Sequence, residues 1–277
     1  MFDTEKLSAL DALMEAQKIA FAPIIFQTAH LLREWGIFTL LHSKKKEGMS
    51  VQELMEATGV NEYGIKVLCE SGYSMGALKL EDDRYYLTRV GFFLQYDEMT
   101  NANFNYSQDV NYLGLQDLGD AIKESRPAGL QHYFNKEWET IYPHLSQLPP
   151  KAKESWFGFD HFYSDSAFQT LVDIMTKRAP KKLLDVGGNT GKWALALTKA
   201  SPETEVTILD HPGQIEVAFK NAEEAGLKER IHGTPMDLLD HSIDFPKGFD
   251  VVWMSQFLDC FPPEDIIALL KRAKEAL

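Results

Sequence analysis

The sequence predicts an α/β protein with a doubly wound parallel sheet in its C-terminal part and a mainly helical domain before it. Three observations point to this class. From about Lys181 onward, short apolar segments alternate with amphipathic ones, as strands and helices do in such sheets. A turn containing three glycines follows the first apolar segment, at residues 187–191. Upstream, residues 5–74 are dominated by helix patterns.

The C-terminal elements follow one another in a regular alternation. Four segments read as strands, namely "KLLDVG" (182–187), "EVTILD" (205–210), "RIHGTPMDLL" (230–239) and "FDVVWMSQFL" (249–258). Three segments read as helices, namely "KWALALTKA" (192–200), "QIEVAFKNAEEAGL" (214–227) and "PEDIIALLKRAKEAL" (263–277). Because strand–helix–strand crossovers are right-handed, these strands should be parallel. We place this Rossmann-like domain at residues 181–277.

Residues 1–100 are expected to form a winged-helix-like module. Apolar residues recur every three or four positions over residues 5–42, which predicts two helices separated at Pro23. Ser50 and Glu53 have the spacing of a capping box at the start of a third helix. The remaining signals are Gly59 as a helix end, Asn61 as the next helix start, and Asp82-Asp83 as a hairpin turn.

Residues 101–180 are less patterned and rich in aromatic side chains, Trp138 and Trp156 among them. Most of these aromatic residues should pack helices, and a minority should wall a pocket for a flat substrate. A helix should resume after Pro149-Pro150. This segment is therefore expected to be a helical linker that contributes to a substrate pocket.

The composition disfavours several classes of function. The 277 residues carry a net charge of −13, which argues against broad contact with nucleic acid or an anionic membrane. Cys69 and Cys260 are far apart in sequence, so a disulfide framework is not expected. The N-terminus has acids where a secretory signal would carry bases, and no stretch reaches the roughly 18 to 20 apolar residues of a membrane span. We expect a cytoplasmic protein that binds neither nucleic acid nor membrane.

The winged-helix pattern raises the alternative of a DNA-binding regulator. Such modules often bind DNA through the second helix of the pair. Here that helix, residues 62–72, offers Lys66 against Glu62 and Glu70. A surface of this charge repels phosphate, so packing or dimerisation is the preferred role.

The glycine-rich turn "DVGGNTGK", residues 185–192, is the main functional signal. A phosphate loop of the G-x-x-x-x-G-K-[ST] type is excluded, because Val186 and Trp193 stand where a glycine and a hydroxyl residue are needed. A dinucleotide fingerprint G-x-G-x-x-G counted from Gly187 fails at Asn189 and Lys192. What remains is an acid, three glycines, and a second acid at the end of the next strand.

That arrangement favours a ligand with a ribose, no pyrophosphate and a positive centre. Asp210 at the tip of the second strand can accept both ribose hydroxyls. Asp185 beside the loop disfavours a pyrophosphate and suits an ammonium or a sulfonium. S-Adenosylmethionine meets these demands. The alternative is a glycine-rich turn that serves packing alone.

The motifs resemble those of the S-adenosylmethionine-dependent O-methyltransferases of the plant caffeate and animal hydroxyindole type. "LLREWGIFTLLHS", "SVQELMEATGVNEYGIKVLCESG" and "DRYYLTRVGFFL" resemble the N-terminal dimerisation module of that family, which is winged-helix-like. "LLDVGGNTG" resembles its cofactor motif V-D-V-G-G-G-x-G, with Asn189 in place of the middle glycine. The resemblance implies a class I methyltransferase fold, S-adenosylmethionine as cofactor, and a homodimer formed through the N-terminal domain.

The same resemblance implies a set of cofactor-binding residues. "LDHP" is similar to the family's D-L-P, so Asp210 would hold the ribose and His211 would flank the adenine. "PMDLL" is similar to its G-D-F-F, which puts Asp237 and Leu238 at the adenine. The expected set is Asp185, Gly187, Gly188, Asn189, Gly191, Asp210, His211, Asp237, Leu238 and Ser255.

The chain departs from the family at the general base. The family's S-x-x-L-H-D-W is "SQFLDCF" here, so Asp259 stands where the histidine belongs and Cys260 where its aspartate neighbour belongs. Proton transfer from a phenol to an ordinary aspartate is uphill by about 8 kcal/mol, against about 5 for a histidine. Burial can raise the aspartate pKa and close part of that gap. His161 on the preceding helix is a second candidate base, and His30 a third that a dimer partner would contribute.

The sequence thus predicts an O-methyltransferase acting on a small aromatic hydroxyl compound. The alternative is a methyltransferase-fold protein that binds the cofactor without O-methylation. No cluster has metal-ligand spacing, so we expect a metal-independent protein. The family continues beyond "KRAKEAL" with three further strands, so the given sequence is expected to be a truncated version.

Overall fold

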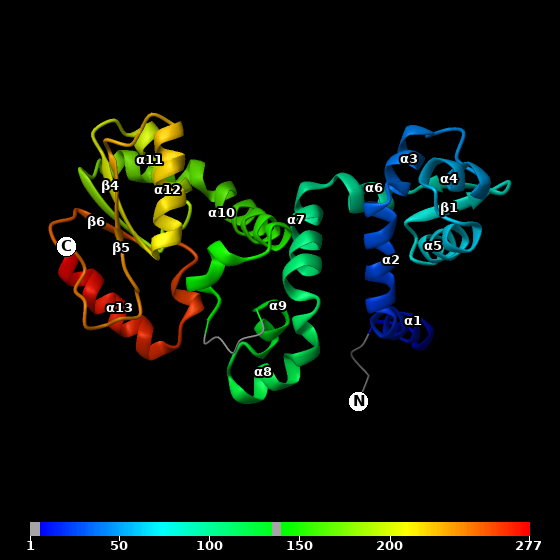
Figure 1. Cartoon of the computed structure of the whole chain (residues 1–277), viewed down its shortest axis with the longest axis horizontal. Coiled ribbons are helices and arrows are strands. Elements are labelled where there is room, and N and C mark those ends of the chain that lie inside the picture. Colours follow the sequence, from blue (N-terminus) through cyan, green and yellow to red (C-terminus); the bar gives the residue numbers. More distant parts are fainter. Residues whose placement is uncertain (1–5, 135–139) are drawn as a thin grey trace. The chain divides into compact units, whose positions relative to one another are not determined.

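The computed structural model describes residues 6–134 and 140–277, and the chain divides into two compact units, Met1–Gln108 and Asp109–Leu277. Each unit is considered by itself below. Figure 1 shows the helices and strands of both units coloured along the sequence. Trp138, one of the aromatic residues expected near a pocket, lies outside the described residues.

Unit 1 is mainly helical and carries one small hairpin. Its elements are α1 (Ala9–Ala20), α2 (Ala22–Glu34), α3 (Ile37–Ser43), α4 (Val51–Thr58), α5 (Glu62–Ser74), β1 (Leu78–Glu81), β2 (Arg84–Leu87), α6 (Arg89–Tyr96) and α7 (Glu98–Tyr106). The predicted two helices over residues 5–42 are in fact three. The break lies at Gly36, whose φ of 74° lets the chain leave α2 in the left-handed region.

The local signals of unit 1 act as the sequence predicts. The Ser50 side chain accepts the Glu53 N–H and the Glu53 side chain accepts the Ser50 N–H, which closes the capping box. Gly59 ends α4 with φ 73°, and the Asn61 side chain caps α5. Asp82 and Asp83 both have positive φ and join β1 to β2. Leu32, Phe38, Leu54 and Ile65 are fully buried in the core of this unit.

The first part of unit 2 is helical. The π-helical turn η1 (Ser107–Asn111) crosses the boundary, followed by η2 (Gly114–Asp117), α8 (Leu118–Glu124), η3 (Ala128–Leu130), α9 (Gln131–Phe134), η4 (Tyr142–Gln147) and α10 (Pro150–Arg178). Helix α10 begins directly after Pro149, as the sequence predicts. It is the helix that brings polar side chains to the edge of the sheet.

The rest of unit 2 is the expected parallel sheet with its helices. The elements are β3 (Lys182–Val186), α11 (Lys192–Ala200), β4 (Glu205–Asp210), α12 (Pro212–Glu224), β5 (Ile231–Pro235), β6 (Val251–Trp253), η5 (Leu258–Cys260) and α13 (Pro263–Ala276). The strand order is β5-β4-β3-β6, and all three neighbouring pairs are parallel. The strand order reverses beside β3, where open sheets of this kind bind ligands.

Helices cover both faces of this sheet. Leu183, Val206 and Ile208 point to one face, where they pack with α11, α12 and the end of α10. Leu184 and Leu209, their neighbours along the strands, point to the other face and pack with α13. The alternation follows from the pleat, which sends successive side chains to opposite faces. Figure 1 shows α11 and α12 on one side of the sheet and α13 on the other.

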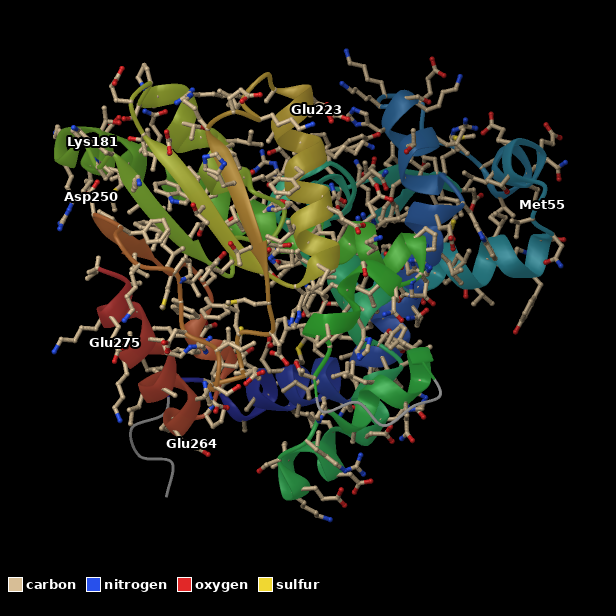
Figure 2. All side chains as sticks on the ribbon, turned by 60° about the vertical axis from the view of Figure 1, so that its left-hand side comes forward. Met55, Lys181, Glu223, Asp250, Glu264 and Glu275 are labelled. Atoms are coloured by element: carbon tan, nitrogen blue, oxygen red, sulfur yellow. The ribbon has the colours of Figure 1, made fainter. Side chains whose placement is uncertain are left out.

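One carboxylate, at the start of β6, joins this strand to the start of β3. Asp250 Oδ2 accepts the backbone N–H groups of Lys181 and Lys182, at 2.8 and 2.9 Å. Figure 2 shows Lys181 and Asp250 side by side. These two hydrogen bonds lower the Asp250 pKa below its usual value. The fourth strand is shorter than predicted: it ends at Trp253 and the chain then turns away, with Gln256 at φ 47°.

Candidate functional site

A pocket opens at the carboxyl end of β3, between the glycine-rich loop, the end of β6 and one face of α10. It encloses about 500 Å³ of empty space that is continuous with solvent. Its lining consists of Asp160, His161, Ser164, Phe168, Asp185, Gly187, Gly188, Asn189, Thr190, Lys192, Trp193, Trp253, Ser255 and Gln256. Parallel strands all end at this edge of the sheet, which explains why segments far apart in sequence meet here.

The loop glycines allow the backbone to run close to its neighbours. A Cβ on Gly188 would lie 2.7 Å from Asp185 Oδ2, and a Cβ on Gly187 would lie 2.4 Å from the Phe257 ring. Gly187 also has φ 74°, a region that side chains rarely adopt. Gly191 has φ 75° and begins α11 close to Ala218. The three glycines are therefore required by the fold of the loop itself.

Asp185 is the most deeply buried acid of the pocket, with 2% of its surface exposed. Burial, and secondarily the charge of Asp210, raise the Asp185 pKa to about 8. Its Oδ2 atom is buried and has no hydrogen-bond partner among the described residues. A buried carboxylate oxygen without a donor is costly, and a ligand that brings a donor or a positive charge would remove that cost.

Asp210 ends the neighbouring strand and is held by the backbone. Its Oδ2 accepts the Asn189 N–H at 2.8 Å, and its Oδ1 accepts the His211 N–H at 2.7 Å. Burial raises the Asp210 pKa, and the two backbone hydrogen bonds partly offset that rise. The carboxyl group therefore has a fixed orientation beside the loop.

His161 comes from α10 and lies half-buried in the pocket wall. Its Nε2 is 3.1 Å from Thr190 Oγ1, and its ring stacks on Phe157 with centroids 6.0 Å apart. Burial, and then the charge of Lys192, lower the His161 pKa to about 4. The imidazole is therefore neutral near pH 7.

Asp259, the residue at the position of the family histidine, does not line the pocket. It lies in η5 with an exposed side chain, whereas Cys260 beside it is half-buried. Burial raises the Cys260 pKa, partly offset by a hydrogen bond with Tyr142. Among the residues described here, the titratable side chains that line the pocket are Asp160, His161, Asp185 and Lys192.

The other expected residues have varied positions. Ser255 lines the pocket, and His211 precedes α12. Asp237 is exposed and accepts the Leu239 N–H at 3.0 Å. Leu238 is buried with the α13 core, and its carbonyl accepts a hydrogen bond from Arg272 at 2.7 Å. His30 belongs to unit 1, where its Nε2 is 3.2 Å from Glu34.

The sequence analysis expects residues 101–180 to contribute to a pocket, but of the α10 side chains that line it, only His161 was named as a candidate. Asp160, Ser164 and Phe168 also line the pocket from this helix. The spacing of four residues between 160, 164 and 168 puts them on one helix face, and that spacing was readable in the sequence. Trp193 and Trp253 complete an aromatic wall, stacked at 4.4 Å between ring centroids.

Two negative findings concern the described residues alone. Over residues 6–134 and 140–277, no three His, Cys, Asp or Glu side chains are grouped so as to hold a metal ion. Within the same ranges, the helices are too short or too polar to cross a membrane.

Comparison with known proteins gives two domain matches. Residues 14–85 match the Dimerisation2-like domain, and residues 183–277 match a methyltransferase domain. The first covers most of unit 1, and the second covers the sheet and the glycine-rich loop.

Individual proteins are similar over much of the chain. The L-tyrosine C(3)-methyltransferase of Streptomyces lavendulae is 29% identical over 262 residues, which cover 94% of this chain and 70% of that protein. A demethylspheroidene O-methyltransferase of Cereibacter sphaeroides is 35% identical over 109 residues, 39% of this chain and 27% of that protein. The crystal structure of the S-adenosylmethionine-dependent methyltransferase SibL, in its apo form, superposes with a TM-score of 0.68 at 26% identity, covering 97% of this chain and 77% of that one.

Both domains, their order and the parallel sheet agree with the resemblance found in the sequence. The expected fold class and cofactor dependence are confirmed. The chain therefore combines a Dimerisation2-like domain with a class I methyltransferase domain, and its homologues are S-adenosylmethionine-dependent methyltransferases of the plant-type O-methyltransferase family.

Proposed function

We propose that the protein transfers a methyl group from S-adenosylmethionine to the hydroxyl oxygen of a small aromatic compound. The observation that carries this proposal is the pair of buried acids, Asp185 and Asp210, at the ends of adjacent strands around the glycine-rich loop. A cationic nucleoside would favour the charged form of these acids, whereas a phosphate would disfavour it.

The residues present fit this cofactor. Asp185 Oδ2 is a buried acceptor without a donor among the described residues, so an ammonium or a sulfonium nearby would stabilise its charged form. Asp210 still has lone pairs for the ribose hydroxyls beyond its two backbone hydrogen bonds. Gly187 and Gly188 let the loop backbone approach the ligand. When bound, the cofactor supplies an activated methyl group on its sulfonium.

An aromatic substrate is supported by the walls of the pocket. Phe168, Trp193 and Trp253 line it, and Trp193 stacks on Trp253. Flat apolar walls exclude water and favour a flat ring. Alignment of the hydroxyl with the methyl group can supply much of the rate, because the methyl group needs no further activation.

The substrate hydroxyl must also lose its proton. We propose that the His161 side chain lies next to this hydroxyl, since the imidazole is neutral and lines the pocket, while Asp259 is exposed. With a pKa of about 4, His161 is a weak base towards a phenol, and the transfer would be uphill by about 8 kcal/mol. Its main effect would therefore be to orient the hydroxyl, with the proton leaving late or to water.

Methyl transfer to a ring carbon of a phenol is the second candidate. It is favoured by the similarity to a tyrosine C(3)-methyltransferase and by the weak base in the pocket. Electron density from a phenol oxygen also reaches its neighbouring ring carbons, so the same pocket can present either atom. A third outcome is cofactor binding without transfer, as the exposed Asp259 would permit.

One experiment separates these outcomes. The full chain is incubated with methyl-labelled S-adenosylmethionine and a panel of phenols, and the product methyl group is located by NMR. An O–CH₃ signal supports the main proposal, and a ring C–CH₃ signal supports the second candidate. Binding of S-adenosylhomocysteine in calorimetry with no labelled product supports the third. Absence of binding of either nucleoside would overturn all three.

We also propose that the protein acts as a homodimer through unit 1. This is supported by the Dimerisation2-like match and by α1, which presents large apolar side chains to solvent. Leu10, Leu13 and Met14 are 66%, 56% and 56% exposed. Light scattering of the full chain should give twice the monomer mass. The Leu13→Asp variant should have a measured mass closer to that of the monomer.

A further inference from the structure

Helix α10 and the glycine-rich loop are joined by three polar contacts that follow the same order along both segments. Asn189 Nδ2 donates to Asp160 Oδ2 at 2.8 Å, and Thr190 Oγ1 lies 3.1 Å from His161 Nε2. Lys192 Nζ donates to Asp165 Oδ2 at 2.7 Å. Contacts in the same order along both segments fix the helix face against the loop. We call these three contacts the α10–loop seam.

Asn189 is the centre of this seam because it is bonded to acids on both sides. Its backbone N–H donates to Asp210, and its side-chain amide donates to Asp160. Its φ of 52° lies in the left-handed region, which is unfavourable for a residue with a side chain. The hydrogen bond to Asp160 offsets that cost and holds the loop in this conformation.

Asp160 also decides how the Asn189 amide is turned. A carboxylate accepts only, so the NH₂ group must face Asp160 and the carbonyl must face the other way. The Oδ1 atom of Asn189 is consequently a buried acceptor, without a partner among the residues described. Since Asn189 lines the pocket, Asp160 governs an acceptor beside the cofactor site.

The Asp160 pKa lies above its ordinary value, with burial as the largest cause. Burial raises the Asp160 pKa, the hydrogen bond from Asn189 lowers it, Asp165 raises it and Lys192 lowers it again. A protonated Asp160 would lose strength as an acceptor for Asn189, so a charged one gives the stronger seam.

We propose that Asp160 is a positioning residue for cofactor binding, which holds the loop over residues 187–191 in its binding conformation through Asn189 and joins it to the pocket face of α10. This inference rests on the proposed function for its ligand. It concerns the loop conformation, and it assigns Asp160 no contact with the reacting atoms.

Calorimetry with S-adenosylhomocysteine on the full chain tests the proposal. Asp160→Ala should weaken binding about tenfold, since it removes a hydrogen bond to a charged group. Asp160→Asn should bind within about threefold of wild type, because the asparagine carbonyl can still accept from Asn189. The control is Asp173→Ala, which removes another carboxylate of α10. Within the described part of the chain, this carboxylate accepts one hydrogen bond, from Gln169 at 3.1 Å. This variant should bind as wild type does.

A double-mutant cycle tests whether Asp160 acts through Asn189. In an Asn189→Gly background, Asp160 has no amide side chain from which to accept a hydrogen bond. Asp160→Ala should therefore have little further effect on nucleoside binding in that background. An equal loss in both backgrounds would overturn the proposal. So would Asp160→Asn binding as poorly as Asp160→Ala, because that would assign the effect to charge alone.

Hydrogen exchange without any nucleoside gives a readout that does not depend on the cofactor. Amides of residues 187–192 should exchange faster in Asp160→Ala than in wild type, and Asp160→Asn should restore protection. If these amides exchange equally fast in Asp160→Ala and in wild type, Asp160 does not position the loop, even if the wild type binds the nucleoside. If the wild type binds neither nucleoside, the proposed function fails, and the exchange comparison still tests the seam.

Discussion

Asp185 is the last residue but one of β3 and Asp210 is the last residue of the neighbouring parallel strand β4, and the charge of Asp210 adds to burial in raising the pKa of Asp185 to about 8. Two acids held this way are unfavourable in the free protein. The arrangement is stable near neutral pH because Asp185 retains its proton there. A positively charged ligand would favour the charged form of Asp185 over the protonated form.

The substitution Asp185→Asn should stabilise the free protein at alkaline pH. The folded pKa of about 8 exceeds the ordinary value of 3.8, so between these values the folded state binds the proton and the unfolded state has lost it. Stability from this group therefore falls as pH rises from about 4 to about 8. The amide of the variant cannot ionise, so the melting temperature of the variant should exceed that of wild type above pH 8. Thermal unfolding from pH 5 to 9 measures this, and equal melting temperatures at pH 9 would contradict it.

Cofactor binding should release protons near neutral pH. A cation beside Asp185 favours its charged form, so binding S-adenosylmethionine at pH 7 should expel about one proton, and fewer at pH 9. Calorimetry in two buffers of different ionisation enthalpy measures the number released. Affinity should rise with pH up to about 8 and then level off. A binding enthalpy independent of the buffer at pH 7 would rule this out.

The substitution Gly188→Ala should disrupt the loop. The added Cβ would lie 2.7 Å from Asp185 Oδ2 and 2.8 Å from Ile208 Cγ2, so strand or loop must shift, at about 1–3 kcal/mol. We expect nucleoside affinity to fall at least tenfold. Gly158→Ala is the matched control: this glycine lies within α10, and its Cβ would have no heavy atom within 4 Å in the described chain. That variant should gain about 0.5–1 kcal/mol and bind normally.

His161 and Asp259 can be separated by their effects on turnover with a substrate found in the phenol panel. His161 lines the pocket, so His161→Ala should lower kcat by at least about tenfold, a modest share of what acid–base groups contribute. Asp259 is exposed, so Asp259→Ala should leave kcat within about twofold. The reverse order of effects would assign the proton to Asp259 and reject the role proposed for His161.

The local parts of the site could be read from the sequence because each depends on few neighbours. An acid, glycines with positive φ and a strand tip are adjacent along the chain, so the sequence alone could group Asp185, Gly187 and Asn189, which all line the pocket. Asp160 was missed, because its meaning comes from Asn189, 29 positions later, across a tertiary contact. The end of β6 was missed because Met254 and Phe257 are apolar, yet they pack beside the α13 core and not in the sheet.

The Phe257 ring, in the segment after β6, packs directly against Gly187 of the glycine-rich loop. The ring touches the glycine so closely that even a Cβ would not fit between them. We therefore expect a displacement of the segment after β6 to disturb the glycine-rich loop, because it would change the packing of Phe257 on Gly187. Suppose that an acceptor molecule shifts this segment and thereby changes the affinity for the nucleoside by some factor. By thermodynamic reciprocity, the nucleoside then changes the affinity for the acceptor molecule by the same factor. Such a coupling would pass through the contact between Phe257 and Gly187.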